Sequence, residues 1–404
     1  MSTSLLYHCF GIRGYQYVRC LFVHGWTVIK IRQQRQNLRC PACNTRHVKL
    51  RGTFSRVFRT RPIGLKPVFI EFPIPRVECL QCGTVRRVKV QFADPRRTYT
   101  RAFEQLVLSL SQHMTIKSVA QLLCVGWDLV KEIQKRNLHR RFAKPSLKRL
   151  KIIAIDEISI GKGQQFLTIV MDLASGRVVF VGEGKGADAL DPFWRRLRRS
   201  KARIKAVAID MSQAYISAVT SHLPDAHIVF DHFHLIKLYN DKLTAYRRQL
   251  YHEVQDDQAR KVIKGTRWLL LKRRENLNPE RNEEDRLNKA LELNAPLAAC
   301  YYMLDDLRQI WRQPDKAHAK AHLIDWVYDA GSSGIKMLRD MALTVAKHFH
   351  GILAYYDHPI STGPLEGTNN KIKTMKRQAY GFRDKEFFKL KILGIHMTKY
   401  ALTG

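Results

Sequence analysis

The sequence predicts a multidomain chain of mixed α+β and α/β class, in which a small β domain and a helical pair precede an α/β domain and a long helical segment. Three observations predict this organisation. Short β-like runs with Arg-rich turns fill residues 1–93, strands and helices alternate over residues 151–234, and residues 235–356 have almost no strand signals. The 404 residues are enough for several domains of roughly 150 residues each.

Charge is the strongest compositional feature. The chain has 70 Lys and Arg against 35 Asp and Glu, a formal net charge of +35. Residues 1–150 contain 29 basic and 6 acidic residues, and the first acid is Glu71. This excess indicates a polyanionic partner, because each phosphate that a basic side chain contacts releases counterions. No apolar stretch approaches the roughly 18 residues of a membrane span, and the first residues lack the order of a secretory signal, so we expect a cytoplasmic protein.

Four of the eight cysteines form two CxxC pairs: Cys40, Cys43, Cys79 and Cys82. In a cytoplasmic protein such pairs indicate a metal site rather than disulfides, since four thiolates can converge on one tetrahedral Zn²⁺. The strand-like runs between the pairs predict a hairpin that returns one pair to the other. We therefore predict a zinc-ribbon β domain over residues 1–93. A redox CxxC is the alternative, and it is disfavoured because thioredoxin-like surroundings are absent.

Residues 94–145 are predicted to form a helix-turn-helix. Apolar residues over 116–123 share one helical face, residues 124–126 form the turn, and the apolar face continues on a second helix. Lys131, Lys135 and Arg136 are expected on the exposed side of that second helix, where they can face the phosphates of double-stranded DNA. A plain helical hairpin in a core has the same periodicity, and the basic surroundings favour the DNA-binding interpretation.

Residues 146–234 give the clearest α/β pattern. Three strands joined by short turns are followed by a helix at 189–199, a strand, a helix at 213–222 and a last strand. Periodic charged and apolar segments then predict an all-helical insertion over residues 235–356. Residues 357–404 contain a Gly/Pro turn that leads into a basic helix.

Three acids stand out by their position. Asp156 lies inside the first strand of the α/β domain, Asp210 ends the fourth strand, and Glu366 stands at the head of the last basic helix. A carboxylate in an apolar strand is costly unless it is paired or metal-bound. Such acids can hold two Mg²⁺ or Mn²⁺ ions about 3.5–4 Å apart for phosphodiester displacement. A strand-end cap or ion pair is the alternative for any one of them, and Glu183 and Asp357 are substitutes for Glu366.

At this point the sequence resembles a family. The order of two CxxC pairs, helix-turn-helix, then Asp, Asp, helical insertion and Glu is similar to bacterial insertion-sequence DDE transposases of the ISL-three family. The most specific segments are AIDEISIGKGQQFLTIVMDLASGRVV, VAIDMSQAY, FDHFHLIKL, WLLLKRRENL and STGPLEGTNNKIKTMKRQAYGFRD. The resemblance covers nearly the whole chain. It implies an RNase H-like catalytic domain, interrupted by the insertion, that uses two Mg²⁺ ions bound by Asp156, Asp210 and Glu366.

Further residues match such transposases less specifically. His234 is expected to approach the scissile phosphate, or else it is a satisfied histidine at a strand–helix junction. Lys373 and Arg377 share a face with Glu366 and are expected to hold DNA phosphates, the alternative being a solvated basic face. Trp268 is either a residue that stacks on a flipped base or, as we favour, part of a core.

The resemblance implies an enzyme that binds the terminal inverted repeats of an insertion sequence, hydrolyses phosphodiesters and transfers strands. We expect it to act at the bacterial nucleoid as a homodimer or higher homo-oligomer on DNA. A non-catalytic DNA-binding regulator derived from a transposase is the alternative, although such a regulator has no need for all three acids. A plain RNase H-like nuclease would need neither the N-terminal DNA-reading domains nor the insertion.

Overall fold

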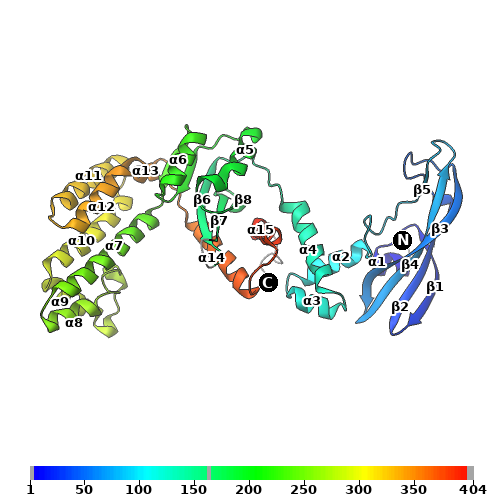
Figure 1. Ribbon diagram of the computed structural model, residues 1–404, viewed down its shortest axis with the longest axis horizontal. Helices are drawn as coiled ribbons and strands as arrows, with labels where there is room; N and C mark the ends of the chain where they lie inside the picture. Colours follow the sequence, from blue (N-terminus) through cyan, green and yellow to red (C-terminus); the bar gives the residue numbers. More distant parts are fainter. Residues whose placement is uncertain (1–3, 162–164, 398–404) are drawn as a thin grey trace. The chain divides into compact units, whose positions relative to one another are not determined.

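A computed structural model describes residues 4–161 and 165–397 of the chain. Residues 1–3, 162–164 and 398–404, which fall within the predicted ribbon domain and the two predicted parts of the catalytic core, lie outside the described residues. The chain divides into two compact units, Met1–Lys144 with Thr374–Gly404 and Pro145–Lys373 (Figure 1). The first break, between Lys144 and Pro145, falls at the predicted boundary between residues 94–145 and 146–234 to within one residue. No helix of the described part is long and apolar enough to cross a membrane.

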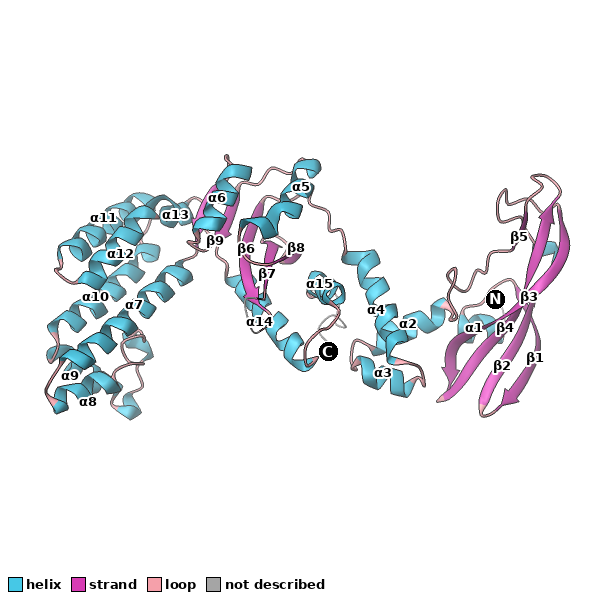
Figure 2. Ribbon diagram, in the orientation of Figure 1, coloured by secondary structure: helices cyan, strands magenta, loops and turns pink. Residues whose placement is uncertain are grey.

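The first unit begins with a five-stranded sheet in the order β1-β2-β4-β3, with β5 paired to β4 (Figure 2). Its elements are α1 (Leu5–Phe10), β1 (Tyr15–Val23), β2 (Trp26–Gln33), η1 (Arg35–Asn37), β3 (Val48–Ile63), β4 (Lys66–Cys79) and β5 (Val85–Arg87). The long β3–β4 hairpin is the one expected between the CxxC pairs, and its register places Val48 opposite Cys79. Aromatic and branched residues such as Phe58, Ile70 and Phe72 form its core.

Four helices complete this unit. They are α2 (Arg101–Leu110), α3 (Ile116–Leu122), α4 (Trp127–Phe142) and α15 (Lys385–Gly394). The hydroxyls of Thr100 and Thr115 accept the backbone N–H groups of Phe103 and Ser118, which caps α2 and α3. The turn before α4 contains Cys124 in the left-handed region, at φ 51°. The helix-turn-helix expected from the apolar periodicity is therefore present.

The C-terminal helix α15 packs on α4, which the sequence did not reveal. Phe387 and Leu390 share a core with Leu138 and Phe142 of α4. The contact is close at Gly394, where a Cβ would come within 3.0 Å of Leu138. Our prediction assigned residues 357–404 as a whole to the catalytic core, whereas the structure groups Thr374–Gly404 with the N-terminal unit.

The second unit contains a five-stranded sheet in the order β10-β9-β6-β7-β8. Its strands are β6 (Ile152–Ser159), β7 (Phe166–Asp172), β8 (Arg177–Glu183), β9 (Ala206–Ile209) and β10 (His227–Phe230). Strands β6, β7 and β8 are antiparallel neighbours, while β9 runs parallel to both β6 and β10. The helices η2 (Ala187–Leu190), α5 (Asp191–Ser200) and α6 (Gln213–His222) join the last strands. The predicted order of strands and helices is confirmed.

Residues 232–356 are helical. Their elements are α7 (His232–Glu253), α8 (Asp257–Gly265), η3 (Arg274–Asn276), η4 (Pro279–Arg281), α9 (Glu283–Glu292), α10 (Ala295–Gln309), η5 (Ile310–Arg312), α11 (Lys316–Ser332), α12 (Lys336–Lys347), α13 (Phe349–Leu353) and η6 (Ala354–Tyr356). Their apolar faces form one continuous core with the sheet. Helix α13 packs closely on β10, since a Cβ at Gly351 would lie 2.3 Å from the Phe230 ring. Helix α14 (Gly363–Gln378) follows this segment.

Candidate active site and metal centre

Two of the predicted catalytic acids lie side by side on the sheet. Strands β6 and β9 are parallel and pair Ile152 with Ala206 and Ala154 with Ala208. The same register, continued by two residues, places Asp156 opposite Asp210. Because parallel strands end at the same edge of a sheet, both carboxylates face the same end of the second unit.

The surroundings of Asp156 make its charge costly. Burial, together with the neighbouring charges of Asp210 and Glu157, raises the pKa of its carboxyl to about 6, against the lowering effects of the Glu157 N–H and of His234. The backbone N–H of Glu157 donates to Asp156 Oδ1 over 2.8 Å. The first turn of α7 therefore brings His234 within electrostatic range of the predicted catalytic acid. Closely spaced carboxylates of this kind fit a divalent cation, which relieves their repulsion.

Helix α14 approaches Asp156 through a residue that the sequence analysis missed. The side-chain Nδ2 of Asn369 donates to Asp156 Oδ2 over 2.8 Å, and Asn369 is 5% exposed. Its Oδ1 is buried and has no hydrogen-bond partner among the described residues. Glu366 lies one helical turn earlier, on the same side of α14, and is exposed. The spacing of three residues between Glu366 and Asn369 was the available signal.

The start of α14 is held by a second missed contact. Asp231 follows β10 and is 2% exposed. Its carboxylate caps α7 by accepting the N–H of Phe233 and also accepts both the N–H and the hydroxyl of Thr362. The carbonyl of Thr362 in turn accepts the N–H of Glu366 over 2.8 Å. Asp231 therefore positions the helix that carries Glu366.

The structure does not bring all three predicted acids into one ready-made cluster. Among the described residues, the group of metal-ligand side chains that converges is formed by the four cysteines, and no group of three acids does so. Asp156 and Asp210 are neighbours, whereas Glu366 points into solvent. The proposed substitute Asp357 is engaged elsewhere, because it pairs with Lys316.

The four cysteines meet as the sequence predicted. Their sulfur atoms all lie within 4.8 Å of one another, with 3.7 Å between Cys40 and Cys82 and 3.4 Å between Cys43 and Cys79. A tetrahedral Zn²⁺ with Zn–S bonds near 2.3 Å needs sulfur–sulfur distances of about 3.8 Å, so the donor set fits a structural zinc ion. Each knuckle closes with the same turn, in which residue 44 or 83 donates to the carbonyl of the first cysteine.

The electrostatics of the sulfur cluster agree with a bound cation. The hydroxyl and backbone of Thr84 hydrogen-bond to Cys82 and lower the pKa of its thiol to about 6. For Cys43 the backbone of Thr45 acts in the same direction, but desolvation and the three other sulfurs prevail and raise the pKa to about 12. Four thiolates at these distances repel one another, and a positive ion would offset that repulsion.

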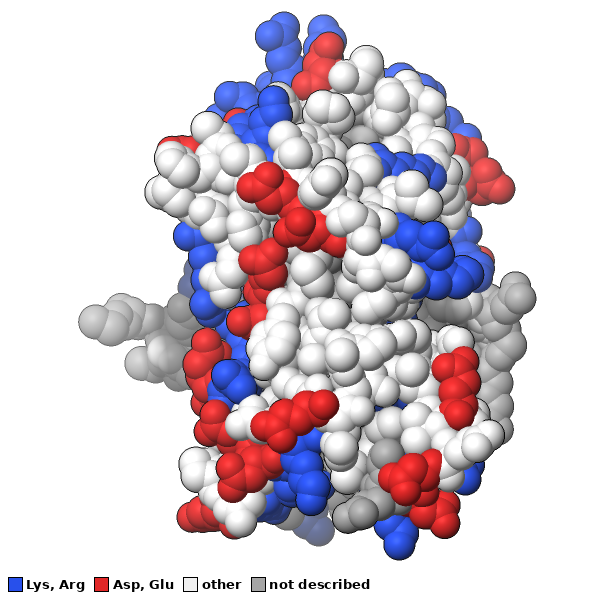
Figure 3. Space-filling view, turned by 90° about the vertical axis from the view of Figure 1, so that its left-hand side faces the viewer, with Lys and Arg blue, Asp and Glu red and all other residues white. Residues whose placement is uncertain are grey.

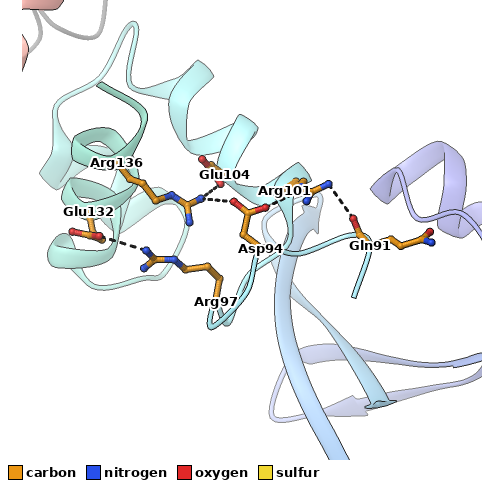
Figure 4. A network of polar contacts seen from close by, with 7 residues as sticks. All are labelled: Gln91, Asp94, Arg97, Arg101, Glu104, Glu132 and Arg136. Carbon is orange, nitrogen blue, oxygen red and sulfur yellow. Dashed lines mark hydrogen bonds and ion pairs between the residues drawn. The ribbon is translucent and has the colours of Figure 1, made fainter. Parts of the chain in front are cut away.

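The predicted exposure of the basic residues of α4 is wrong. Lys131 and Lys135 form ion pairs with Asp384 at 3.0 and 3.1 Å, and Lys135 also pairs with Glu386. Figure 4 shows that Arg136 points to Glu104 and to Asp94, an acid that Arg101 also contacts. The physical reason is the packing of α15 and of the segment before α2 on α4, which no local pattern revealed.

The remaining predicted DNA-binding residues are exposed. Lys373 and Arg377 lie on the solvent side of α14. Trp268 is 65% exposed, so our favoured alternative of core packing is wrong for it. The guanidinium of Arg267 lies 4.6 Å from the centre of the Trp268 ring. An exposed aromatic residue beside an arginine is compatible with stacking on a nucleotide base.

Comparisons with known proteins agree with this organisation. Residues 153–392 match the family described as "Transposase" of the ISL3 type, residues 88–136 match the helix-turn-helix domain of transposase family ISL3, and residues 36–82 match the zinc finger of transposases IS204, IS1001, IS1096 and IS1165. The chain is 35% identical over 356 residues to the transposase for insertion sequence element IS1001 of Bordetella parapertussis, which covers 87% of each protein.

More distant similarities are also found. The transposase for insertion sequence element IS1557 of Mycobacterium tuberculosis is 28% identical over 360 residues, which is 82% of this chain and 80% of the relative. Among solved structures, the Drosophila P element transposase strand transfer complex covers 74% of this chain and 93% of its own, with 11% identity and a TM-score of 0.38, a similarity too low to carry an argument. The family matches and the IS1001 relative are sufficient: the chain belongs to the ISL3 family of insertion-sequence transposases and is a DDE transposase.

Proposed function

We propose that this transposase binds the terminal inverted repeats of its insertion sequence and cleaves and joins DNA with Mg²⁺ or Mn²⁺ held by Asp156, Asp210 and Glu366. The observation that carries the proposal is the proximity of Asp156 on β6 to Asp210, which directly follows the parallel strand β9 and whose charge raises the pKa of Asp156. The order of three antiparallel strands followed by two parallel ones supports an RNase H-like core, with the helices of residues 232–356 as its insertion.

The residues present fit divalent cations. Asp156 and Asp210 supply carboxylate oxygens, which are the ligands that Mg²⁺ prefers, and their mutual repulsion favours a positive ion between them. Such ions, when bound, activate the attacking oxygen and stabilise the leaving oxygen of a phosphodiester. Glu366 would join them as the third acid, one turn of α14 before the contact between Asn369 and Asp156.

The chain's own side chains orient this site. Asn369 holds one oxygen of the Asp156 carboxylate, and Glu157 holds the other through its backbone N–H. Asp231 anchors the start of α14 through Thr362. His234 would approach the scissile phosphate from α7, and Lys373 would contact the DNA backbone from the exposed side of α14.

The charge distribution supports the orientation of the DNA. On α10 and α11, Asp305, Asp325 and Asp329 lie close enough to raise the pKa of Asp306, in addition to the effect of its burial. Figure 3 shows acidic side chains gathered in a band on the face that the helical segment presents. DNA phosphates would be repelled there. We therefore propose that DNA runs along α14 and the strand ends, and that a homodimer or higher oligomer joins two element ends at the nucleoid.

The test is cleavage of labelled DNA taken from the flanks of the gene by Asp156→Asn, Asp210→Asn and Glu366→Gln. Each variant should lose about a thousandfold or more in cleavage rate while its DNA affinity stays unchanged, because the acids act as a unit through the cations. Asp172→Asn is the matched control, since Asp172 lies on the same sheet beside Ile153. Normal cleavage by all three variants would refute the proposal, and normal cleavage by Glu366→Gln alone would exclude Glu366.

A further inference from the structure

An open groove crosses one face of the ribbon sheet. Its volume is about 670 Å³. One wall is the run Arg32–Gln36 at the end of β2 and in η1, and the opposite wall is the β3–β4 hairpin at Thr53, Pro73 and Pro75. Four glutamines and two arginines therefore line a concave surface of the N-terminal unit.

Two prolines explain why the sheet opens at this point. Strands β2 and β4 pair in parallel from Thr27 opposite Val68 to Lys30 opposite Glu71, and the pairing then stops. Since β3 occupies one edge of β4 throughout, Pro73 and Pro75 face the β2 side, where Pro75 O accepts the N–H of Val88. Proline has no N–H to donate, and from Pro75 onward Val88 and β5 occupy this edge of β4, so the ladder with β2 ends at Lys30 and Glu71.

The groove carries the side chains that read base edges. Arg and Gln make paired hydrogen bonds to guanine and adenine in the major groove. Arg32, Arg35 and Gln36 are exposed, whereas Gln33 is engaged, because its Nε2 donates to the carbonyl of Asn37 over 3.1 Å. Among the described residues that line the groove there is no Asp or Glu. The acid of β4 that comes nearest in sequence to Pro73 is Glu71, and it is paired with Lys30.

The run is also held in a fixed shape. Arg32 Nε donates to Gln16 Oε1 over 3.1 Å, and Gln36 Nε2 donates to Gln34 Oε1 over 2.9 Å. Leu38 and Cys40 directly after the run are buried, and Cys40 belongs to the sulfur cluster. A bound zinc ion would therefore anchor this wall of the groove, which reduces the entropy lost when DNA binds.

The helix that would read DNA in a helix-turn-helix is less suited to this task. The exposed side chains in the first half of α4 are Trp127, Asp128 and Glu132, of which two are acids that repel phosphates. Lys131, Lys135 and Arg136 are engaged in ion pairs with α15, α2 and the segment before α2, and the exposed Arg140 and Arg141 lie in the last turn of α4, far from its N-terminal half.

We propose that the groove of the ribbon, and not the second helix of the helix-turn-helix, reads the base sequence of the element ends. Double-stranded DNA would place its base edges against Arg32, Arg35 and Gln36. This assignment rests on the proposed function, because it presupposes that the transposase recognises its own ends.

The test uses the full-length protein with zinc bound and two labelled duplexes, the DNA from the gene's flanks and a shuffled sequence of equal length. The ratio of the two affinities measures sequence reading. The double variant Arg35→Ala with Gln36→Ala should lower that ratio about ten- to a hundredfold, since each paired base contact discriminates to this extent. Arg86→Ala, an exposed arginine of β5 outside the groove, should weaken both duplexes alike, and Trp127→Ala should leave the ratio unchanged.

Two results would overturn the inference. One is a double variant that behaves like Arg86→Ala, with equal losses on both duplexes, and the other is loss of the ratio in Trp127→Ala. A wild-type protein that binds both duplexes equally would refute end recognition itself and, with it, this reader. Cleavage of the flank duplex by the wild-type protein separates the two cases, because it tests the proposed function independently of the groove variants.

Discussion

Replacing Asn369 by alanine tests how strictly the catalytic carboxylate must be oriented. The amide donates to Asp156 over 2.8 Å in a site where Asn369 is 5% exposed. A hydrogen bond to a charged group contributes about 1.5–3 kcal/mol. If that energy is realised when the cations and DNA are in place, the cleavage rate should fall roughly ten- to 150-fold.

The same substitution should affect folding little. Alanine removes the buried and unpartnered Oδ1 together with the donor, so the loss of one contact is offset by the loss of an unsatisfied polar atom. The assay is the rate of cleavage of labelled end DNA as a function of Mg²⁺ concentration. An orienting role predicts a lower maximal rate and a higher half-saturating Mg²⁺ concentration, with DNA affinity and melting temperature near those of the wild type.

Asn370→Ala is the matched control, because the neighbouring asparagine is exposed on the same helix. It should cleave at close to the wild-type rate. The reasoning is refuted if Asn369→Ala cleaves like the wild type, or if both asparagine variants lose activity to the same degree.

Three further predictions concern the N-terminal unit. Metal analysis of the wild-type protein should find about one Zn²⁺ per chain and Cys79→Ser should lose it, whereas a metal-free yet folded ribbon in the wild type would contradict the site. Burial lowers the pKa of Lys391 to about 8, against an ordinary value of 10.5. Because the buried charge is costly, Lys391→Met should stabilise the fold by up to about 3 kcal/mol at pH 7. Calorimetry should show that this gain becomes smaller as the pH rises from 8 to 10.5. Burial raises the pKa of Asp384, but hydrogen bonds from the Phe387 N–H and from Lys131 outweigh this effect and lower the pKa to about 2, against an ordinary value of 3.8. The stability that the Asp384 carboxylate gives to the fold should therefore be lost as the pH falls from about 4 to 2. Asp384→Ala should cost about 1 kcal/mol through the lost cap of α15, whereas equal melting temperatures of Asp384→Ala and the wild type would contradict that contact.

Local sequence patterns predicted correctly those parts of the fold that depend on residues close together in the sequence. The CxxC pairs and the strand runs between them predicted the hairpin and the meeting of the four sulfurs, because a β-hairpin has a defined register. The alternation of apolar strands and helices predicted the order of the α/β unit, and helix α6 spans the predicted residues 213–222.

Contacts between distant segments were beyond the sequence. The packing of α15 on α4 joins residues about 250 positions apart, and it pairs Lys131 and Lys135, which we expected to be exposed, with Asp384. In the same way, the spacing from Glu366 puts Asn369 on the same side of α14, but nothing local showed that it would reach Asp156 across 213 positions. Periodicity tells which face of a helix is apolar, but it does not tell which acid a polar side chain on the other face will meet.

The central claim is that Asp156, Asp210 and Glu366 share bound divalent cations although Glu366 is exposed in the structure. Fe²⁺ in place of Mg²⁺, with ascorbate and peroxide, cuts the polypeptide next to the ion that generates the radicals. On the transposase bound to end DNA, we expect cuts in the polypeptide near Asp156, Asp210 and Glu366. In Asp210→Asn, the cuts at all three places should disappear together. Cuts near Asp156 and Asp210 without any near Glu366 would contradict it.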